Sequence, residues 1–421
     1  MMKKNTDVLV IGAGLSGLMA AAKAVAQHKK VLLVAKGMGA LGLSSGCIDL
    51  WGYQINQPDK VCTNPLAEIA KLVSHKPEHP YAKVADVLPE SIDFFLQICH
   101  QNKISYLNTN RNWQLPTALG TLRPTYLVPQ SMAVPDLAEV KELLVVGFQA
   151  LKDFYPDVLI TNLQKNTPLG AHCHLKTLMV KLANQELNAN TLAHLLEKQA
   201  MLEQVISQIK PHVLPGMVVL FPPVLGEQLG HEVTEVLSEK LGCSVYEVAN
   251  IPPALPGQRL QKALLHHLKT QGVEVIIGCQ VTDAQITEKR CQGVVANSNG
   301  KIMEISAQTM VLATGSFLGG GLTSQSNEIK EAVFGLPVKV CPGKWSRQDF
   351  LSLAGQPFHE FGVAVNDQLQ PLDDQGQVLL ENVLITGANL AGCNYPIEKC
   401  GNGVALASGY KAGKLVGEAG R

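Results

Sequence analysis

Residues 8–17, VLVIGAGLSG, join a short apolar run to a glycine-rich turn near the start of the chain. An alanine-rich segment follows to about His28, and a second apolar run spans 31–34. Short apolar runs bounded by turn residues are typical of buried strands, and the small-residue segment between them favours a helix. The stretch therefore predicts a β-α-β unit that opens an α/β sheet of the Rossmann type.

The glycines of this turn meet the backbone demands of a phosphate-binding loop. Gly12 permits a tight turn, Gly14 lets an anion approach the backbone, and Gly17 lets helix pack on strand. The N–H groups at the helix N-terminus would face the phosphate. A glycine motif can arise by chance, but its place between strand and helix favours binding. We predict cofactor contacts at Gly12, Gly14, Leu15, Ser16 and Gly17.

The end of the second predicted strand lacks the carboxylate that usually grips the ribose of an adenine dinucleotide. Ala35 and Lys36 stand there instead. An adenosine ribose would lose hydrogen bonds to a charged acceptor, whereas a mononucleotide would lose nothing. These two residues therefore favour FMN over FAD. Lys36 could lie near a phosphate, although a solvated lysine is the commoner case.

Two later apolar runs also end in Thr-Gly, at 309–315 and at 383–387, and a small-residue helix is predicted from about Gly403 to Val416. The N-terminus of that helix would stabilise the negative charge of a reduced flavin. A loop rich in serine and glycine follows the second strand, at the sheet edge where ligands usually bind. Together, these sites favour a flavin over a nicotinamide. The further predicted contacts are Ser44, Ser45, Gly46, Thr314, Gly315, Gly387, Ala388, Gly401, Asn402 and Gly403.

The chain has 421 residues, which is long for one core, so a second lobe is expected. The predicted class is α/β, a Rossmann-type flavin-binding domain with an inserted second α+β lobe. Helices are expected at 92–100 and 191–209, and a strand at 217–221. The flavin-binding domain is assigned residues 1–55, 216–323 and 358–421, the inserted lobe 56–215, and an irregular insertion 324–357.

Composition narrows the possible partners and cofactors. Thirty-five basic residues balance thirty-five acidic ones, so no net field attracts nucleic acid. The ten cysteines are scattered and predict free thiols. Cys393 and Cys400 lack the spacing of a zinc or iron–sulfur site, so no metal site is assigned.

Longer motifs extend the pattern over essentially the whole chain, and with the glycine sites they resemble the two-domain flavoprotein superfamily that includes fumarate reductases. More narrowly, they resemble the B subunits of bacterial anaerobic glycerol-3-phosphate dehydrogenases. The motifs are GLSSGCIDL at 42–50, HPY at 79–81, LGTLR at 119–123, LPGQRL at 255–260, ATGSF at 313–317, GGGL at 319–322, FGV at 361–363, and the glycine-rich stretch around 400–403.

The resemblance implies a flavoprotein using FMN, with FAD as the alternative because the glycine fingerprint accompanies FAD in most relatives. It implies two partners, a larger FAD-containing A subunit and an iron–sulfur C subunit that docks the complex on the inner membrane. The implied reaction oxidises sn-glycerol 3-phosphate to dihydroxyacetone phosphate and passes electrons to quinone, then to fumarate or nitrate. The chain would be cytoplasmic and peripherally associated with the membrane through its partners.

A phosphate substrate calls for arginine, and alcohol oxidation calls for a base and a hydride acceptor. Arg123, Arg259 and Arg347 are the candidates, with surface ion pairs as the competing interpretation. His79 and His359 could be bases, but lone histidines are more often structural. No base is assigned, because the larger partner could oxidise the substrate while this chain relays electrons. The alternatives are a free-standing FAD-dependent oxidase or fumarate-reductase-like enzyme, and a flavin-free Rossmann scaffold.

Overall fold

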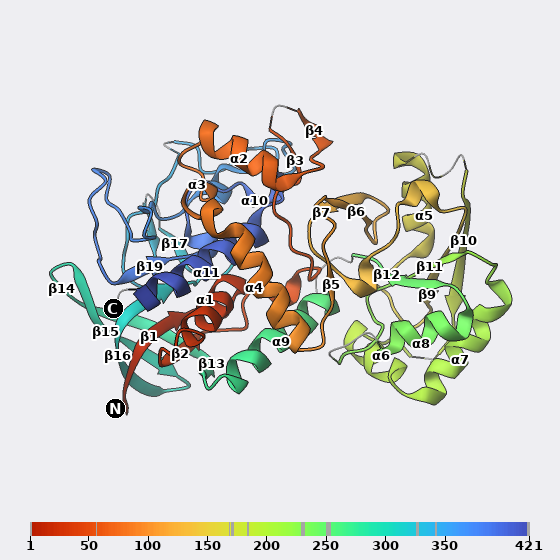
Figure 1. The fold of residues 1–421 in the computed structure, drawn as a ribbon, viewed down its shortest axis with the longest axis horizontal. Helices are drawn as coiled ribbons and strands as arrows, with labels where there is room; N and C mark the ends of the chain where they lie inside the picture. The colour runs from red at the N-terminus through yellow and green to blue at the C-terminus, as the bar shows by residue number, and fades with distance from the viewer. Residues whose placement is uncertain are drawn as a thin grey trace. The chain divides into compact units, whose positions relative to one another are not determined.

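A computed structural model describes residues 2–418 except 56, 168, 170–171, 183–184, 229–231, 250–253, 326–327 and 342. The chain forms two compact units, which we call unit 1 and unit 2 (Figure 1). Unit 1 combines Met1–Leu41, Ile48–Ile98 and Leu264–Arg421, and unit 2 combines Gly42–Cys47 with Cys99–Ala263. Unit 1 is therefore assembled from three separate stretches of sequence.

Unit 1 contains a seven-stranded sheet of order β13-β2-β1-β16-β15-β14, with β19 also paired to β16. The strands β13, β2, β1, β16 and β19 are parallel to their neighbours in that group, whereas β14 and β15 add antiparallel pairs. The bounds are β1 Met2–Ile11, β2 Val31–Ala35, β13 Glu274–Ile277, β14 Cys279–Thr287, β15 Arg290–Ser298, β16 Lys301–Leu312 and β19 Val383–Ile385.

The strand register aligns four strand ends. Ile11 lies opposite both Val34 and Leu312, and Leu312 lies opposite Ile385. All four side chains are buried. The turns that follow β2, β1, β16 and β19 therefore leave the sheet at one edge, which is where open α/β sheets bind ligands.

The helices α1 (Leu15–Val25) and α11 (Gly401–Glu418) pack closely against each other in unit 1. A Cβ on Gly409 would lie 2.9 Å from Ser16 Cα, so the approach requires glycine. The remaining unit 1 elements are α2 Pro65–His75, α3 Tyr81–Val84, α4 Leu88–Gln101, α10 Tyr395–Glu398 and the paired strands β3 Tyr53–Gln54, β4 Gln57–Val61, β17 Leu322–Gln325 and β18 Glu328–Glu331.

Unit 2 is built on a four-stranded parallel sheet of order β10-β9-β11-β12. Helices connect its strands, and this alternation is typical of a doubly wound α/β unit. The bounds are β9 Glu142–Phe148, α5 Pro156–Asn166, β10 His174–Val180, α6 Ala189–Leu196, α7 Gln199–Ile209, β11 Val218–Phe221, α8 Glu232–Leu241 and β12 Ser244–Glu247, with the small strands β5 Tyr106–Leu107, β6 Trp113–Pro116, β7 Leu122–Thr125 and β8 Val128–Pro129. The helix α9, Leu255–Thr270, begins in unit 2 and ends in unit 1.

The predicted fold class, α/β with a Rossmann-type flavin-binding domain, is confirmed. The second lobe was expected to be α+β, but its parallel sheet with connecting helices makes it α/β. Three local expectations differ from the structure. The helix expected at 191–209 is broken at Glu197 and Lys198. The strand at 217–221 exists as β11, but it belongs to the sheet of unit 2. The boundaries of the inserted lobe also differ, because Ile48–Ile98 belongs to unit 1 and unit 2 continues to Ala263, whereas the lobe was expected at 56–215.

The strand–helix alternation of unit 2 was missed for a physical reason. Its central strand β9 is apolar on both faces, and its edge strand β10 is largely exposed, so neither shows the alternation of a half-buried strand.

Among the helices of the described residues, none combines the length and apolarity required to cross a membrane.

Candidate functional site

Three glycine turns converge at the aligned strand ends of unit 1. Gly12 follows β1 with φ +122°, and a Cβ there would lie 2.6 Å from the carbonyl carbon of Ala313. The Gly12 N–H donates to Val34 O at 2.8 Å, and the Ala313 N–H donates to Ile11 O at 2.8 Å. Only glycine fits this close crossing of β1 and β16.

The N-terminus of α1 leaves open space on one side of Gly14, its N-cap residue. Apart from Gly14 and its chain neighbours, no atom of the described residues lies within 4 Å of the position that a Gly14 Cβ would occupy. No side chain in the described part of the chain caps this helix end. Leu15, Ser16 and Gly17 form the first turn of α1, where backbone N–H groups have no partner within the helix. The arrangement suits a phosphate group.

Asn389, which the sequence analysis missed, joins the second and third glycine turns. Its Oδ1 accepts from the Gly315 N–H at 2.8 Å, and its Nδ2 donates to Thr314 Oγ1 at 3.1 Å. The side chain is fully buried. Gly387 packs against α1, since a Cβ there would lie 3.0 Å from Ser16 Cβ, while Ala388 is exposed. No sequence motif marks an asparagine for this bridging role.

At the N-terminus of α11, Gly403 was predicted to contact the cofactor, but the structure places it in contacts within the protein. The Gly403 N–H donates to Asp49 O at 2.9 Å, and a Cβ on Gly403 would lie 2.9 Å from Leu50 Cδ2. This N–H is engaged within the protein, so Gly403 serves packing. Gly401 and Asn402 are half-buried and remain the residues of this helix end that can face a ligand.

The carboxyl end of β2 offers no acidic group at the expected position. Ala35 is buried and lies opposite Ile277 of β13, and Lys36 is exposed. A ribose diol at this strand end would therefore need other hydrogen-bond partners.

The loop rich in serine and glycine at Gly42–Cys47 belongs to unit 2, and so does Arg123. The Arg123 Nη1 donates to Ser45 Oγ at 3.1 Å, and Ser44 Oγ accepts from the Gly46 N–H at 3.2 Å. Gly46 has φ +79°, and its carbonyl accepts from Tyr106 Oη at 2.6 Å. These predicted residues lie together, and Arg123 is only half-buried.

Arg259 does not face a cleft, as one interpretation expected. Its guanidinium is buried and pairs with Glu247, with Nη1 2.6 Å from Oε2 and Nη2 2.9 Å from Oε1, while Nε and Nη2 donate to Gly226 O. Because these donors are used inside unit 2, the structure gives Arg259 a structural role. The Arg347 Nε donates to Gly355 O at 3.0 Å, and its residue is exposed.

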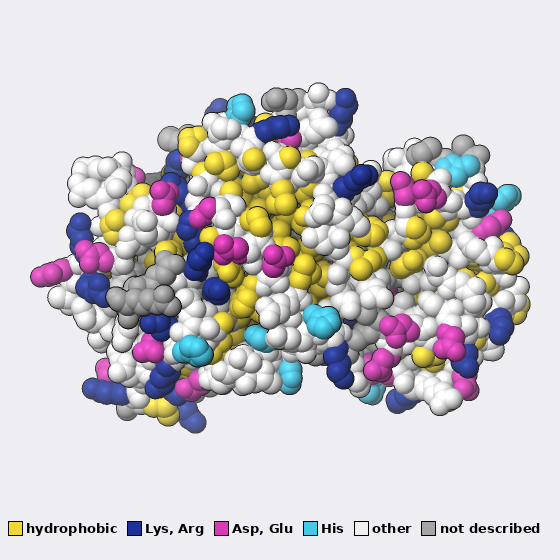
Figure 2. Space-filling model, in the orientation of Figure 1, with side chains coloured by type: hydrophobic (Ala, Val, Ile, Leu, Met, Phe, Trp, Pro, Cys, Tyr) yellow, Lys and Arg dark blue, Asp and Glu magenta, His cyan; other side chains and the backbone are white. Residues whose placement is uncertain are grey.

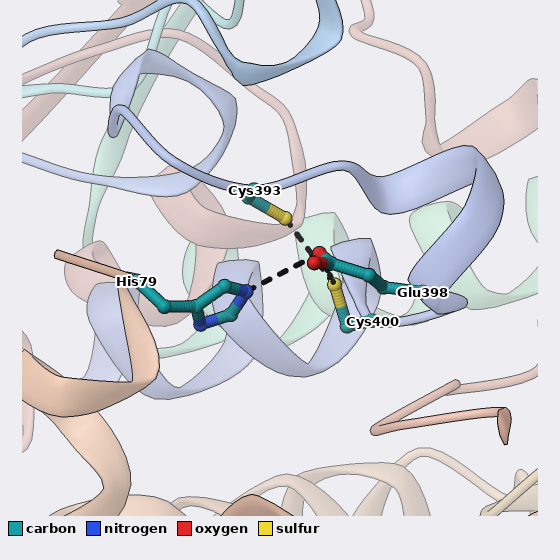
Figure 3. Close-up of side chains that lie close together, drawn as sticks. All are labelled: His79, Cys393, Glu398 and Cys400. Atoms are coloured by element: carbon teal, nitrogen blue, oxygen red, sulfur yellow. Dashed lines mark hydrogen bonds and ion pairs between the residues drawn. The ribbon is translucent and has the colours of Figure 1, made fainter. Parts of the chain in front are cut away.

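Two cysteines, a histidine and a carboxylate meet in unit 1, and we call this set the thiol cluster (Figure 3). Its members are His79, Cys393, Glu398 and Cys400, whose ligand-type atoms all lie within 4.8 Å of one another. The spacing of the two cysteines did not reveal it, because His79 lies more than three hundred residues earlier in the chain.

A separate cavity of about 750 Å³ lies within unit 2, between α6, α7, α8 and the turn after β11. Leu202, Ile206 and Val236 supply apolar lining, with Glu203 and Lys210 beside them. It contains none of the glycine turns. We place the candidate cofactor site in unit 1, because helix N-termini and glycine turns supply the chemistry that phosphates require.

A Rossmann-type sheet with three glycine turns at one edge defines the class of this protein as a dinucleotide-binding α/β protein. The model of the FAD binding domain family matches residues 7–404. The B subunit of a probable anaerobic glycerol-3-phosphate dehydrogenase from Halobacterium salinarum is 30% identical, with 99% of each chain covered. The B subunit of anaerobic glycerol-3-phosphate dehydrogenase from Vibrio cholerae is 30% identical, covering 96% of this chain and 95% of that protein.

The chain belongs to the FAD binding domain family and, within it, to the family of anaerobic glycerol-3-phosphate dehydrogenase B subunits. The resemblance seen in the sequence is thus confirmed. The chain is a flavoprotein oxidoreductase, and the names of both relatives describe them as one subunit of an enzyme. A flavin cofactor is supported, but FMN in particular is not, since the matched family is described by FAD.

Solved structures with weaker similarity include 3-ketosteroid delta1-dehydrogenase from Sterolibacterium denitrificans. It is 12% identical, with a TM-score of 0.46 and coverage of 99% of this chain and 100% of that chain. E. coli quinol fumarate reductase is 9% identical, with a TM-score of 0.42 and coverage of 99% and 71%.

Proposed function

We propose that this chain is one of two FAD-binding components of a complex that oxidises sn-glycerol 3-phosphate to dihydroxyacetone phosphate and passes electrons to quinone. The carrying observation is the convergence of three glycine turns at the aligned ends of β1, β16 and β19. Bound flavin supplies hydride and electron transfer at such a site. The residues of unit 1 hold and orient it.

The proposed flavin contacts are the backbone groups and helix ends that each glycine turn leaves accessible to a ligand. The free backbone at Gly14 to Gly17 would hold the pyrophosphate at the N-terminus of α1. Thr314, Gly315 and Gly387 would let the flavin lie against the backbone, and Asn389 would hold those turns in place. Gly401 and Asn402 at the N-terminus of α11 would face the flavin ring, where the helix dipole favours its reduced, negatively charged form.

Acid release of cofactor from the purified chain, followed by chromatographic separation, tests the proposal. We expect about one FAD per chain. FMN in place of FAD would show that unit 1 selects the mononucleotide, as the missing acid at Ala35 suggests. If the purified chain holds no flavin and also binds none when flavin is added back, its proposed redox function is refuted.

Ala35→Glu should tighten FAD binding by about ten-fold or more, because a hydrogen bond to a charged acceptor contributes about 1.5–3 kcal/mol. FMN lacks the adenosine ribose, so its affinity should stay unchanged. Quenching of flavin fluorescence gives both affinities. Ala35→Gln is the matched control, which adds the same length without the charge. An equal gain for FMN would show that the adenosine half does not lie at the end of β2.

The proposed assembly contains a larger, FAD-bearing A subunit, and an iron–sulfur C subunit that holds the complex on the inner membrane from the cytoplasmic side. On the face drawn in Figure 2, basic and acidic side chains are interspersed. This mixture, with a net charge of zero, supports attachment through partners rather than through a basic surface.

Arg123 with Ser45 is the proposed phosphate contact of this chain.

A further inference from the structure

The thiol cluster brings two buried sulfurs together. Cys393 Sγ and Cys400 Sγ lie 3.2 Å apart, and the two residues are 8% and 0% exposed. The short helix α10 separates them, and Lys399 turns the chain back with φ +50°. The local fold therefore places two cysteines seven residues apart within reach of a disulfide bond.

Glu398 is placed to accept a proton from the second thiol. Its Oε2 lies 3.5 Å from Cys400 Sγ and accepts from the Asn394 N–H at 2.9 Å. Lys76 Nζ lies 3.7 Å from Oε1. Although burial raises the pKa of Glu398, hydrogen bonding and charge from His79, together with the charge of Lys76, lower it overall. The carboxylate is thus held ionised beside the thiol.

His79 acts as a donor in this cluster rather than as a metal ligand. The Tyr81 N–H donates to Nδ1 at 3.1 Å, and this contact favours a ring proton on Nε2, which lies 3.3 Å from Glu398 Oε2. A metal at Nε2 would move that proton to Nδ1, where it would oppose the Tyr81 N–H. The cluster therefore favours thiol chemistry over metal binding.

The protonation of the two thiols differs. Hydrogen bonds from Cys400 and His79 lower the pKa of Cys393, although burial opposes this, whereas burial raises the pKa of Cys400. A stabilised thiolate beside a protonated thiol is the arrangement from which protein disulfides form and break.

We propose that Cys393 and Cys400 form a two-electron redox pair that exchanges electrons with the flavin of unit 1. In the oxidising direction, an S–S bond forms, the Cys400 S–H bond breaks, and its proton passes to Glu398. Two electrons pass to the oxidised flavin, which takes up that one proton and becomes the reduced, negatively charged form. This exchange rests on the proposed flavin site, and Cys400 is bonded directly to Gly401, a proposed flavin contact.

Alkylation of the full chain tests the pair itself, with or without flavin. After treatment with hydrogen peroxide, a small oxidant, denaturation and alkylation should modify eight of the ten cysteines, and a peptide linking Cys393 to Cys400 should appear. Cys341→Ser removes an exposed thiol and should leave this disulfide unchanged. Cys400→Ser and, independently, Cys393→Ser should abolish it. Ten alkylated cysteines in the oxidised chain would overturn the proposal.

A reductive titration tests the exchange with flavin. Dithionite uptake per bound flavin should be twice as large for the oxidised chain as for Cys400→Ser or Cys393→Ser. Equal uptake would overturn the exchange even if the disulfide forms. A chain without flavin would contradict the proposed function, while the alkylation result would still decide whether the pair exists. Stoichiometric zinc that disappears in Cys400→Ser would show a metal site and overturn the redox pair.

Discussion

Gly14→Asp is expected to weaken flavin binding by about 100-fold or more while leaving the fold intact. The position has ordinary backbone angles, φ −75° and ψ 174°, and open space around its Cβ. Aspartate is also a favoured N-cap residue, so α1 should not lose stability. Its carboxylate would lie where the phosphates bind, and two like charges about 4 Å apart repel by about 4 kcal/mol at an effective dielectric constant near 20.

Gly14→Asn is the matched control, because it has the same shape and capping ability without the charge. Flavin affinity by fluorescence titration, with circular dichroism to check the fold, gives the comparison. If Gly14→Asp and Gly14→Asn weakened binding equally, bulk rather than charge would explain the loss. Unchanged binding in both would place the phosphates away from α1.

Glu247→Gln is expected to destabilise unit 2 by about 3–5 kcal/mol, because it leaves the buried Arg259 guanidinium without its counter-charge. Glu247 is fully buried, and it also accepts from the Leu225 N–H at 2.8 Å and from Ser131 Oγ at 2.8 Å. Urea unfolding followed by circular dichroism measures the loss. Glu227→Gln is the control, since it breaks the exposed pair with Lys262 and should cost less than about 1 kcal/mol.

The same pair predicts a pH dependence. Burial alone would raise the pKa of Glu247, but the charge and hydrogen bonds of Arg259 outweigh it and lower the pKa in the folded state. Because the pKa of Glu247 is lower in the folded chain, the pair stabilises the fold fully at pH values above the pKa of an unfolded glutamate, which is about 4.3. This stabilisation is lost as the pH falls from there through the folded-state pKa. The stability difference between the natural chain and Glu247→Gln should therefore shrink at acid pH. A difference that stays constant would mean that Glu247 is protonated in the folded chain.

The first β-α-β unit could be predicted because each of its signals is local. Val8 to Ile11 forms the strand, and Gly12, Gly14 and Gly17 set the turn within a few residues. The convergence of the other two turns could only be inferred, since it depends on β16 and β19 pairing beside β1. Local sequence carries the turn chemistry but not the strand order.

Long-range contacts account for what the sequence did not reveal. Asn389 bridges residues seventy-five positions earlier, and His79 meets Glu398 from a distant segment. The sequence offers Arg259 as a phosphate ligand, but its guanidinium pairs with Glu247, twelve residues earlier on another element. Each of these side chains acquires its role from a partner that no motif specifies.

The assembly of unit 1 from three separate segments has a consequence for biosynthesis. Most of unit 2 is one continuous stretch, from Cys99 to Ala263, so it can begin to fold while the rest of the chain is still being made. The sheet of unit 1 needs Val383–Ile385 to complete its row of strand ends. We therefore expect the cofactor site to be the last part of the protein to form, and ribosome-bound chains that end before β19 to emerge without a flavin.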